Sequence, residues 1–112
     1  MIDKEKAYTL LNRHISFCEI SSYGSESDPE NEFWIPFSEE ISKDIDSAID
    51  FFQELTPNEF IYALEALEEI IERTHSQRLL NEIKRIGTEK EVDQNTLEVE
   101  VKYASYHLSQ NS

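Results

Sequence analysis

The sequence predicts an all-α protein, a compact bundle of about five helices with a long acidic loop between the first and second helices. Three observations lead to this fold class. The 112 residues include only two glycines and three prolines, too few for a turn-rich β architecture. Apolar residues recur at three- and four-residue spacing along most of the chain. Six Phe, five Tyr and one Trp supply a core, so residues 1–112 are expected to form one domain.

The first predicted helix runs from Asp3 to Phe17. Asp3 is expected to cap its N-terminus, because a short carboxylate accepts hydrogen bonds from the free N–H groups of the first turn. Two apolar stripes follow the helix, and a face this broad is expected to pack against more than one neighbour. The stripes are Tyr8, Leu11, Ile15 and Cys18, and Ala7, Leu10, His14 and Phe17.

The segment from Ser21 to Pro36 is predicted to be a loop, because polar turn-forming residues dominate it. It is long for a connection in a compact domain, and such loops often carry function. It ends in an apolar run that either anchors it on the core or forms part of a binding surface. Phe37 is expected to be an anchor, whereas both roles remain open for Trp34.

The second predicted helix runs from Ser38 to Leu55. Ser38 suits the N-cap, and two acidic residues follow it in the first turn, where the helix dipole favours negative charge. Its inward stripe is Phe37, Ile41, Ile45, Ala48 and Phe52, with Ile49 beside it. The residues expected largely outside that stripe are Glu40, Lys43, Asp44, Asp46, Ser47 and Asp50.

Two helices joined by a short polar turn are predicted from Thr56 to Gly87. Thr56 and Glu59 are spaced as a capping box, in which each side chain hydrogen-bonds a free N–H group. Ser76 is expected to cap the second helix, and Gly87 is expected just after its end. The inward residues are Phe60, Leu64, Leu67 and Ile71 in one helix and Leu79, Leu80, Ile83 and Ile86 in the other.

A charged linker is predicted from Thr88 to Asn95, and the segment after it, Thr96 to Ser109, fits two patterns. Leu97, Val99, Val101 and Tyr103 alternate as in a strand, whereas Leu97, Val101, Ala104 and Leu108 are spaced as in a helix. A lone strand would have no partner elsewhere in the chain, so a helix is predicted.

The net charge of the chain limits the classes of partner that it is expected to bind. The formal net charge is −14, and Lys43 is the only basic residue between Glu19 and Glu72. A surface this acidic repels phosphates, so neither nucleic acid nor an anionic membrane is an expected partner. Either solubility or a basic protein partner explains such charge. The single cysteine and the lack of a signal peptide or apolar span predict a cytoplasmic protein.

Chemistry beyond binding finds little support in the sequence. His14 and Cys18 lie four residues apart, a spacing that suits a metal site or a Cys–His pair, but no further ligand accompanies them. Both belong to the apolar stripes, so a structural role is predicted. No phosphate-binding glycine loop, paired-cysteine zinc site or nucleophile elbow is present. No enzyme activity, cofactor or metal is therefore expected.

The run from Phe60 to Leu80 is an acidic amphipathic helix, a Glu-x-x-Ser/Thr-type turn and a second helix. It resembles small helical immunity proteins of bacterial polymorphic toxin systems, including those of contact-dependent growth inhibition. The resemblance implies a protein that binds one cognate toxin domain in the cytoplasm of the producing cell and blocks it. Many such toxins are nucleases with basic surfaces, toward which an acidic inhibitor would associate quickly.

The expected binding surface combines acidic residues that steer the partner with aromatic residues that anchor it. Its predicted members are Tyr23, Glu26, Asp28, Glu30, Glu32, Trp34, Glu40, Asp44, Asp46, Tyr62, Glu65 and Glu69. Two other functions remain open. One is an acidic helical adaptor or regulatory subunit that binds a host protein. The other is a small enzyme built around His14 and Cys18.

Overall fold

In the computed structural model, residues 1–20 and 33–109 are described, and all regular structure among them is helical. The all-α prediction is therefore confirmed. The helices are α1 (Lys4–Ile20), α2 (Ile35–Ile41), α3 (Ile45–Glu54), α4 (Pro57–Ala63), the 3₁₀ helix η2 (Leu64–Ala66), α5 (Leu67–Thr74), α6 (Gln77–Glu89) and α7 (Gln94–Ser109). Most of the predicted acidic loop, residues 21–32, lies outside the described residues.

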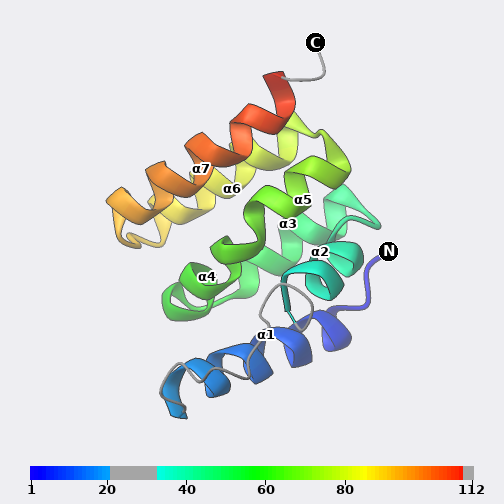
Figure 1. The fold of residues 1–112 in the computed structure, drawn as a ribbon, viewed down its shortest axis with the longest axis vertical. Coiled ribbons are helices and arrows are strands. Elements are labelled where there is room, and N and C mark those ends of the chain that lie inside the picture. The colour runs from blue at the N-terminus through cyan, green and yellow to red at the C-terminus, as the bar shows by residue number, and fades with distance from the viewer. Residues whose placement is uncertain (21–32, 110–112) are drawn as a thin grey trace.

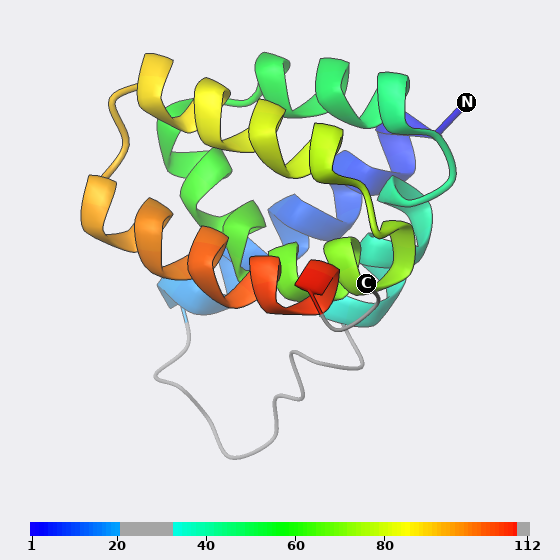
Figure 2. The ribbon, with the colours of Figure 1, turned by 90° about the horizontal axis from the view of Figure 1, so that it is seen from above.

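The helices stack along the longest axis of the molecule, with α1 at one end and α7 at the other (Figure 1). Helix α5 lies between them and packs against both α2 and α7. Helix α6 lies between α3 and α7, which is clear when the molecule is turned (Figure 2). The radius of gyration is 13.3 Å, close to the value of about 13 Å for a folded domain of 100 residues.

A chain of aromatic rings runs through the core. Neighbouring rings of Phe33, Phe37, Phe51, Phe52 and Phe60 have centroids 4.9 to 6.0 Å apart. These are distances at which aromatic pairs add stability beyond the burial of their surface. Phe37 is fully buried, as predicted for an anchor. The chain of rings links α2 to α3 and α4, and it holds the segment before α2 against the core.

The prediction of one continuous helix from Ser38 to Leu55 is wrong, because this segment forms two helices, α2 and α3. Helix α2 begins before Ser38, whose buried hydroxyl donates to the Ile35 carbonyl instead of capping a helix. The chain then turns, and Asp44 caps α3 by accepting a hydrogen bond from the Ser47 N–H at 2.9 Å. Asp44 competes for the free N–H groups of a new helix, which favours a break at this point.

The capping predictions for the other helices are confirmed. Thr56 and Glu59 form a reciprocal capping box with hydrogen bonds of 2.9 and 3.2 Å. Ser76 accepts from the Leu79 N–H, and Asp3 accepts from the Lys6 N–H. The helix that starts at Thr56 is not continuous, however, because the short η2 separates α4 from α5.

Gly87 does not end α6 as predicted but lies inside it. A Cβ atom at this position would lie 2.8 Å from Leu97 Cδ1 and 3.0 Å from Phe60 Cε1. The glycine therefore allows α7 to approach α6 closely. Helix α7 itself confirms the prediction of a helix for the last segment.

On α1 the predicted apolar stripes are only partly buried. Ala7, Leu11, His14 and Ile15 are buried, whereas Tyr8 and Phe17 are exposed. The Tyr8 hydroxyl lies 2.6 Å from Glu59 Oε2, so it ties α1 to the start of α4. None of the helices in the described ranges is long and apolar enough to cross a membrane.

Candidate partner-binding site

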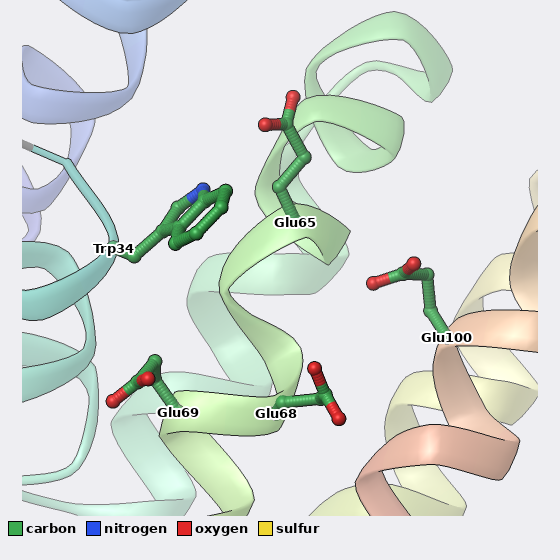
Figure 3. Close-up of a pocket in the computed structure, with 5 residues that line it drawn as sticks. All are labelled: Trp34, Glu65, Glu68, Glu69 and Glu100. Atoms are coloured by element: carbon green, nitrogen blue, oxygen red, sulfur yellow. The ribbon is translucent and has the colours of Figure 1, made fainter. Parts of the chain in front are cut away.

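A pocket of about 320 Å³ opens on the face formed by α2, η2, α5 and α7. Trp34 lies on the α2 side of this pocket and Glu100 on the α7 side (Figure 3). The other lining residues are Glu65 in η2 and Glu68 and Glu69 in α5. We call these five residues the acidic pocket.

Helix geometry explains why these side chains meet. Glu65, Glu68 and Glu69 are spaced by three and four residues, so they share one face of the η2–α5 segment. Buried apolar residues of the same segment, such as Leu67 and Ile70, hold its other face on the core. Helix α7 packs along α5 and brings Glu100 to the opposite wall.

Four carboxylates line the acidic pocket. Glu68 and Glu100 extend toward each other across the space between α5 and α7, while Glu69 lies on the side of Trp34 (Figure 3). Within the described residues, no lysine or arginine forms an ion pair with any of the four carboxylates. Burial, followed by the charges of Glu68 and Glu65, raises the pKa of Glu100. The negative charges gathered in the pocket therefore make the ionised form of Glu100 less favourable.

Two histidines border the acidic pocket. His14 Nε2 lies 3.2 Å from Glu65 Oε1, and the imidazole stacks on Phe33 with ring centroids 4.2 Å apart. Cys18 Sγ lies 3.6 Å from the same nitrogen. His107 Nε2 lies 3.7 Å from Glu68 Oε1. His14 is buried in the core, so its observed contacts agree with the structural role predicted for it.

The pocket joins an indole ring with carboxylates. In the part of the chain that the structure describes, no three His, Cys, Asp or Glu side chains are grouped so that they could hold one metal ion. The wall on the α2 side is an indole ring, which attracts cations through its π face. A guanidinium or ammonium group on a flexible side chain can contact the indole and several carboxylates at once.

The indole nitrogen has an unusual environment. Trp34 Nε1 is buried and has no hydrogen-bond acceptor within the described structure. A buried donor without an acceptor costs about 1–3 kcal/mol. The side chain of Trp34 is partly buried and packs against the core.

Three of the predicted binding residues, Trp34, Glu65 and Glu69, meet in the acidic pocket. The prediction missed Glu68 and Glu100. Glu68 shares the helical face of Glu65, so spacing alone could have included it. Glu100 lies far away in the sequence, and only the packing of α7 on α5 reveals its place.

The expectation that Glu40 faces outward is wrong. Its side chain is 2% exposed and accepts a hydrogen bond from the Asp3 N–H at 2.9 Å. Lys43 lies at 3.0 Å and Lys6 at 3.6 Å from the same carboxylate. The Asp3 hydrogen bond is the main cause of its lowered pKa, which Lys43 and Lys6 lower further against the opposing effect of burial. Because α1 packs against α2, Glu40 faces the start of α1 and stabilises its N-terminus.

The remaining predicted residues do not join the pocket. Asp44 is the cap of α3, and Asp46 pairs with Arg78 of α6 at 2.5 Å. Tyr62 is partly buried, with its ring edge-on to His14 at 6.1 Å between centroids. The others fall on residues 21–32, outside the described residues, and are Tyr23, Glu26, Asp28, Glu30 and Glu32.

Comparison with known protein families, curated proteins and solved structures found no match for this chain. The acidic pocket is therefore the starting point for its function.

Proposed function

We propose that this protein binds a basic partner protein through the acidic pocket, and that it is an immunity protein that neutralises a cognate toxin domain. One observation carries the proposal: four carboxylates and an indole ring line one pocket, and no lysine or arginine of the described residues pairs with those carboxylates. The toxin class that fits best is a basic nuclease, because its phosphate-binding surface would complement this charge.

The electrostatics of the pocket favour a cationic ligand. The raised pKa of Glu100 reflects burial and repulsion by Glu68 and Glu65. An arginine or lysine from a partner would relieve that repulsion and replace water with charge-assisted hydrogen bonds. The same charges would attract a basic partner from a distance, so association would be fast and sensitive to salt.

The site and the resemblance to immunity proteins coincide in the sequence. The stretch from Phe60 to Leu80 that resembles those proteins contains Glu65, Glu68 and Glu69. In this proposal the helix of that stretch supplies most of the pocket's charge. The inhibitor would act in the cytoplasm of the cell that makes the toxin.

Growth rescue tests the proposal directly. The product of the gene immediately upstream would be expressed alone and with this protein, and cell growth and co-purification would be measured. We expect the upstream product to arrest growth and this protein to bind it and restore growth. The proposal fails if the upstream product is harmless, or if co-expression neither restores growth nor yields a complex.

Matched variants connect the rescue to the pocket. Glu68→Gln/Glu100→Gln removes two charges from the pocket, and Glu5→Gln/Asp50→Asn removes two exposed charges from α1 and α3. We expect the pocket variant to slow association and weaken the complex about tenfold or more, whereas the control keeps nearly full affinity. Equal effects of the two variants would show that only the net charge matters.

A further inference from the structure

Helix α7 has a second apolar face, outside the core, whose side chains are about half exposed. Val99, Tyr103 and Tyr106 are 47%, 48% and 47% exposed, and they are spaced by four and three residues along one side of the helix. The tyrosine rings form an edge-to-face pair with centroids 6.2 Å apart. We call these three residues the α7 stripe.

The α7 stripe and the acidic pocket share one helix and lie side by side on it. Tyr103 follows Glu100 by three residues and precedes His107 by four, and such spacings place residues next to each other on a helix surface. His107 in turn lies 3.7 Å from Glu68 of the pocket. Aromatic and acidic groups therefore form one continuous surface across α5 and α7.

From this surface we infer that α7 is a docking site for a basic amphipathic helix of the partner protein. The apolar face of that helix would pack on the α7 stripe, and one of its arginine or lysine side chains would enter the acidic pocket beside Trp34. This inference rests on the proposed function and specifies the surface and the ligand chemistry that serve it.

Charge complementarity selects this occupant. Glu100 lies beside the stripe on α7 and Glu68 faces it from α5, so an apolar segment without positive charge would leave these carboxylates desolvated and without a lysine or arginine partner. A second copy of this chain carries the same net charge of −14 and would be repelled. A helix fits the linear stripe, which spans eight residues and rises about 10 Å along α7, because helices pack by setting side chains between the ridges of a neighbour.

The arrangement follows the usual anatomy of a binding surface. Tyrosine and tryptophan are favoured at the energetic centre of interfaces, because they bury a large area for few rotatable bonds. Here two exposed tyrosines lie beside the carboxylates that would orient a basic partner. The stripe would supply most of the binding free energy, and the pocket would set the register and the charge preference.

A defined probe tests the surface without knowledge of the natural partner. The probe is a helical peptide with leucines on one face and arginines on the other, and the control peptide carries glutamates in place of the arginines. Binding to the full chain would be mapped by the chemical-shift changes of its backbone amides. We expect the arginine peptide to perturb α7, the N-terminal half of α5 and the Trp34 indole, and the glutamate peptide to leave them unchanged.

Paired variants identify the residues responsible. Tyr103→Ser/Tyr106→Ser and Glu68→Gln/Glu100→Gln should each weaken peptide binding about tenfold or more. Phe17→Ser, which alters another exposed aromatic residue on α1, and Glu5→Gln/Asp50→Asn should change it less than about twofold. Circular dichroism of every variant would verify that the helices remain folded.

Four results would overturn the inference. Shift changes spread over all acidic faces would show general charge attraction, and equal effects of stripe and control variants would show that the stripe is not used. Self-association of the chain that Tyr103→Ser/Tyr106→Ser abolishes would assign the stripe to a second copy. Growth rescue that survives in the stripe and pocket variants would overturn this surface but leave the proposed function intact. Peptide binding at α7 without any rescue by the native chain would overturn the proposed function alone.

Discussion

At the scale of single residues, Glu100 couples the pocket to folding stability. Its pKa is raised in the folded protein, so its ionised form is less favourable there than in the unfolded chain. Its charge thus lowers stability at pH values above the folded pKa, and this cost disappears as the pH falls through that pKa and the carboxyl becomes protonated. Binding surfaces often contain groups that lower the free energy of unfolding in this way.

We therefore predict that Glu100→Gln raises the melting temperature at pH 7. The advantage should shrink as the pH falls through the raised pKa of Glu100 toward the ordinary glutamate value of about 4.3, because the native carboxyl then becomes neutral as well. Thermal unfolding followed by circular dichroism across this pH range would test it. Glu98→Gln, an exposed neighbour on α7, is the control. A gain that is the same at every pH would mean that charge is not its cause.

Glu40 behaves in the opposite way. Its lowered pKa means that its charge stabilises the folded state above the normal glutamate range, and that this contribution is lost as the pH falls through the folded pKa. We predict that Glu40→Ala lowers the unfolding free energy by about 1.5–3 kcal/mol, since the Asp3 N–H loses its charged acceptor. Glu40→Gln should lose less.

Glu39→Gln, at the exposed neighbouring position, is the control for Glu40 and should change stability by less than about 0.5 kcal/mol. Denaturant unfolding at pH 7 and at acid pH would separate the variants. The difference between the native protein and Glu40→Gln should be largest at pH 7. If it grew as the pH fell, the sign of the Glu40 contribution would be the reverse of that stated here.

At the scale of helices, the contact between α6 and α7 depends on Gly87. We predict that Gly87→Ala destabilises the protein, because a methyl group so close to Leu97 costs about 1–3 kcal/mol of overpacking, against a gain of about 1 kcal/mol in helix propensity. Leu97→Ala alone should cost about 2–5 kcal/mol. In the Leu97→Ala background, however, Gly87→Ala should cost less, because the new methyl group enters the space that the leucine has left and only the close contact with Phe60 remains.

A double-mutant cycle measured by denaturant unfolding tests this coupling between Gly87 and Leu97. Independent effects of the two substitutions would mean that the helices can separate freely at this point. In that case the short distances from Gly87 would place no constraint on the packing of α7.

The packing of helix α7 explains why its sequence fits both a strand pattern and a helix pattern. Leu97 and Ala104 face the core, with Val101 and Leu108 partly buried beside them, whereas Val99 and Tyr103 face solvent. Apolar residues on two faces of one helix produce the alternation that also describes a strand. The ambiguity of the sequence thus reflects a real feature, an apolar face that is not part of the core.

Helix caps could be predicted because their chemistry is local. The capping box at Thr56 and the caps at Asp3 and Ser76 depend on residues three positions apart, and all are present. Side-chain direction in α2 could not be predicted, because it depends on where the helix begins and on contacts with the distant Asp3. Glu100 was missed for the same reason, since its place in the pocket is a consequence of tertiary packing.

At the scale of the whole molecule, excess negative charge acts over the full size of the fold. The molecule measures 39 × 26 × 26 Å, and the screening length is about 30 Å at 0.01 M salt but only about 3 Å at 1 M. At low salt most pairs of carboxylates therefore repel each other, whereas at high salt only close neighbours interact. In the described chain, the carboxylates paired with lysine or arginine are those of Glu40, Asp46, Glu54, Glu82 and Glu89.

We therefore predict that sodium chloride raises the melting temperature of the free protein and weakens its complex with a basic partner. Both effects have one cause, because screening reduces the repulsion within the chain and the attraction between the partners. Thermal unfolding and association rates, measured over the same salt series, would test the link. Sucrose, which stabilises proteins without screening charge, is the control. It should leave the electrostatic attraction between the partners unchanged. A melting temperature that falls with salt would show that the local ion pairs outweigh the general repulsion, and the electrostatic reason for a basic partner would then be lost.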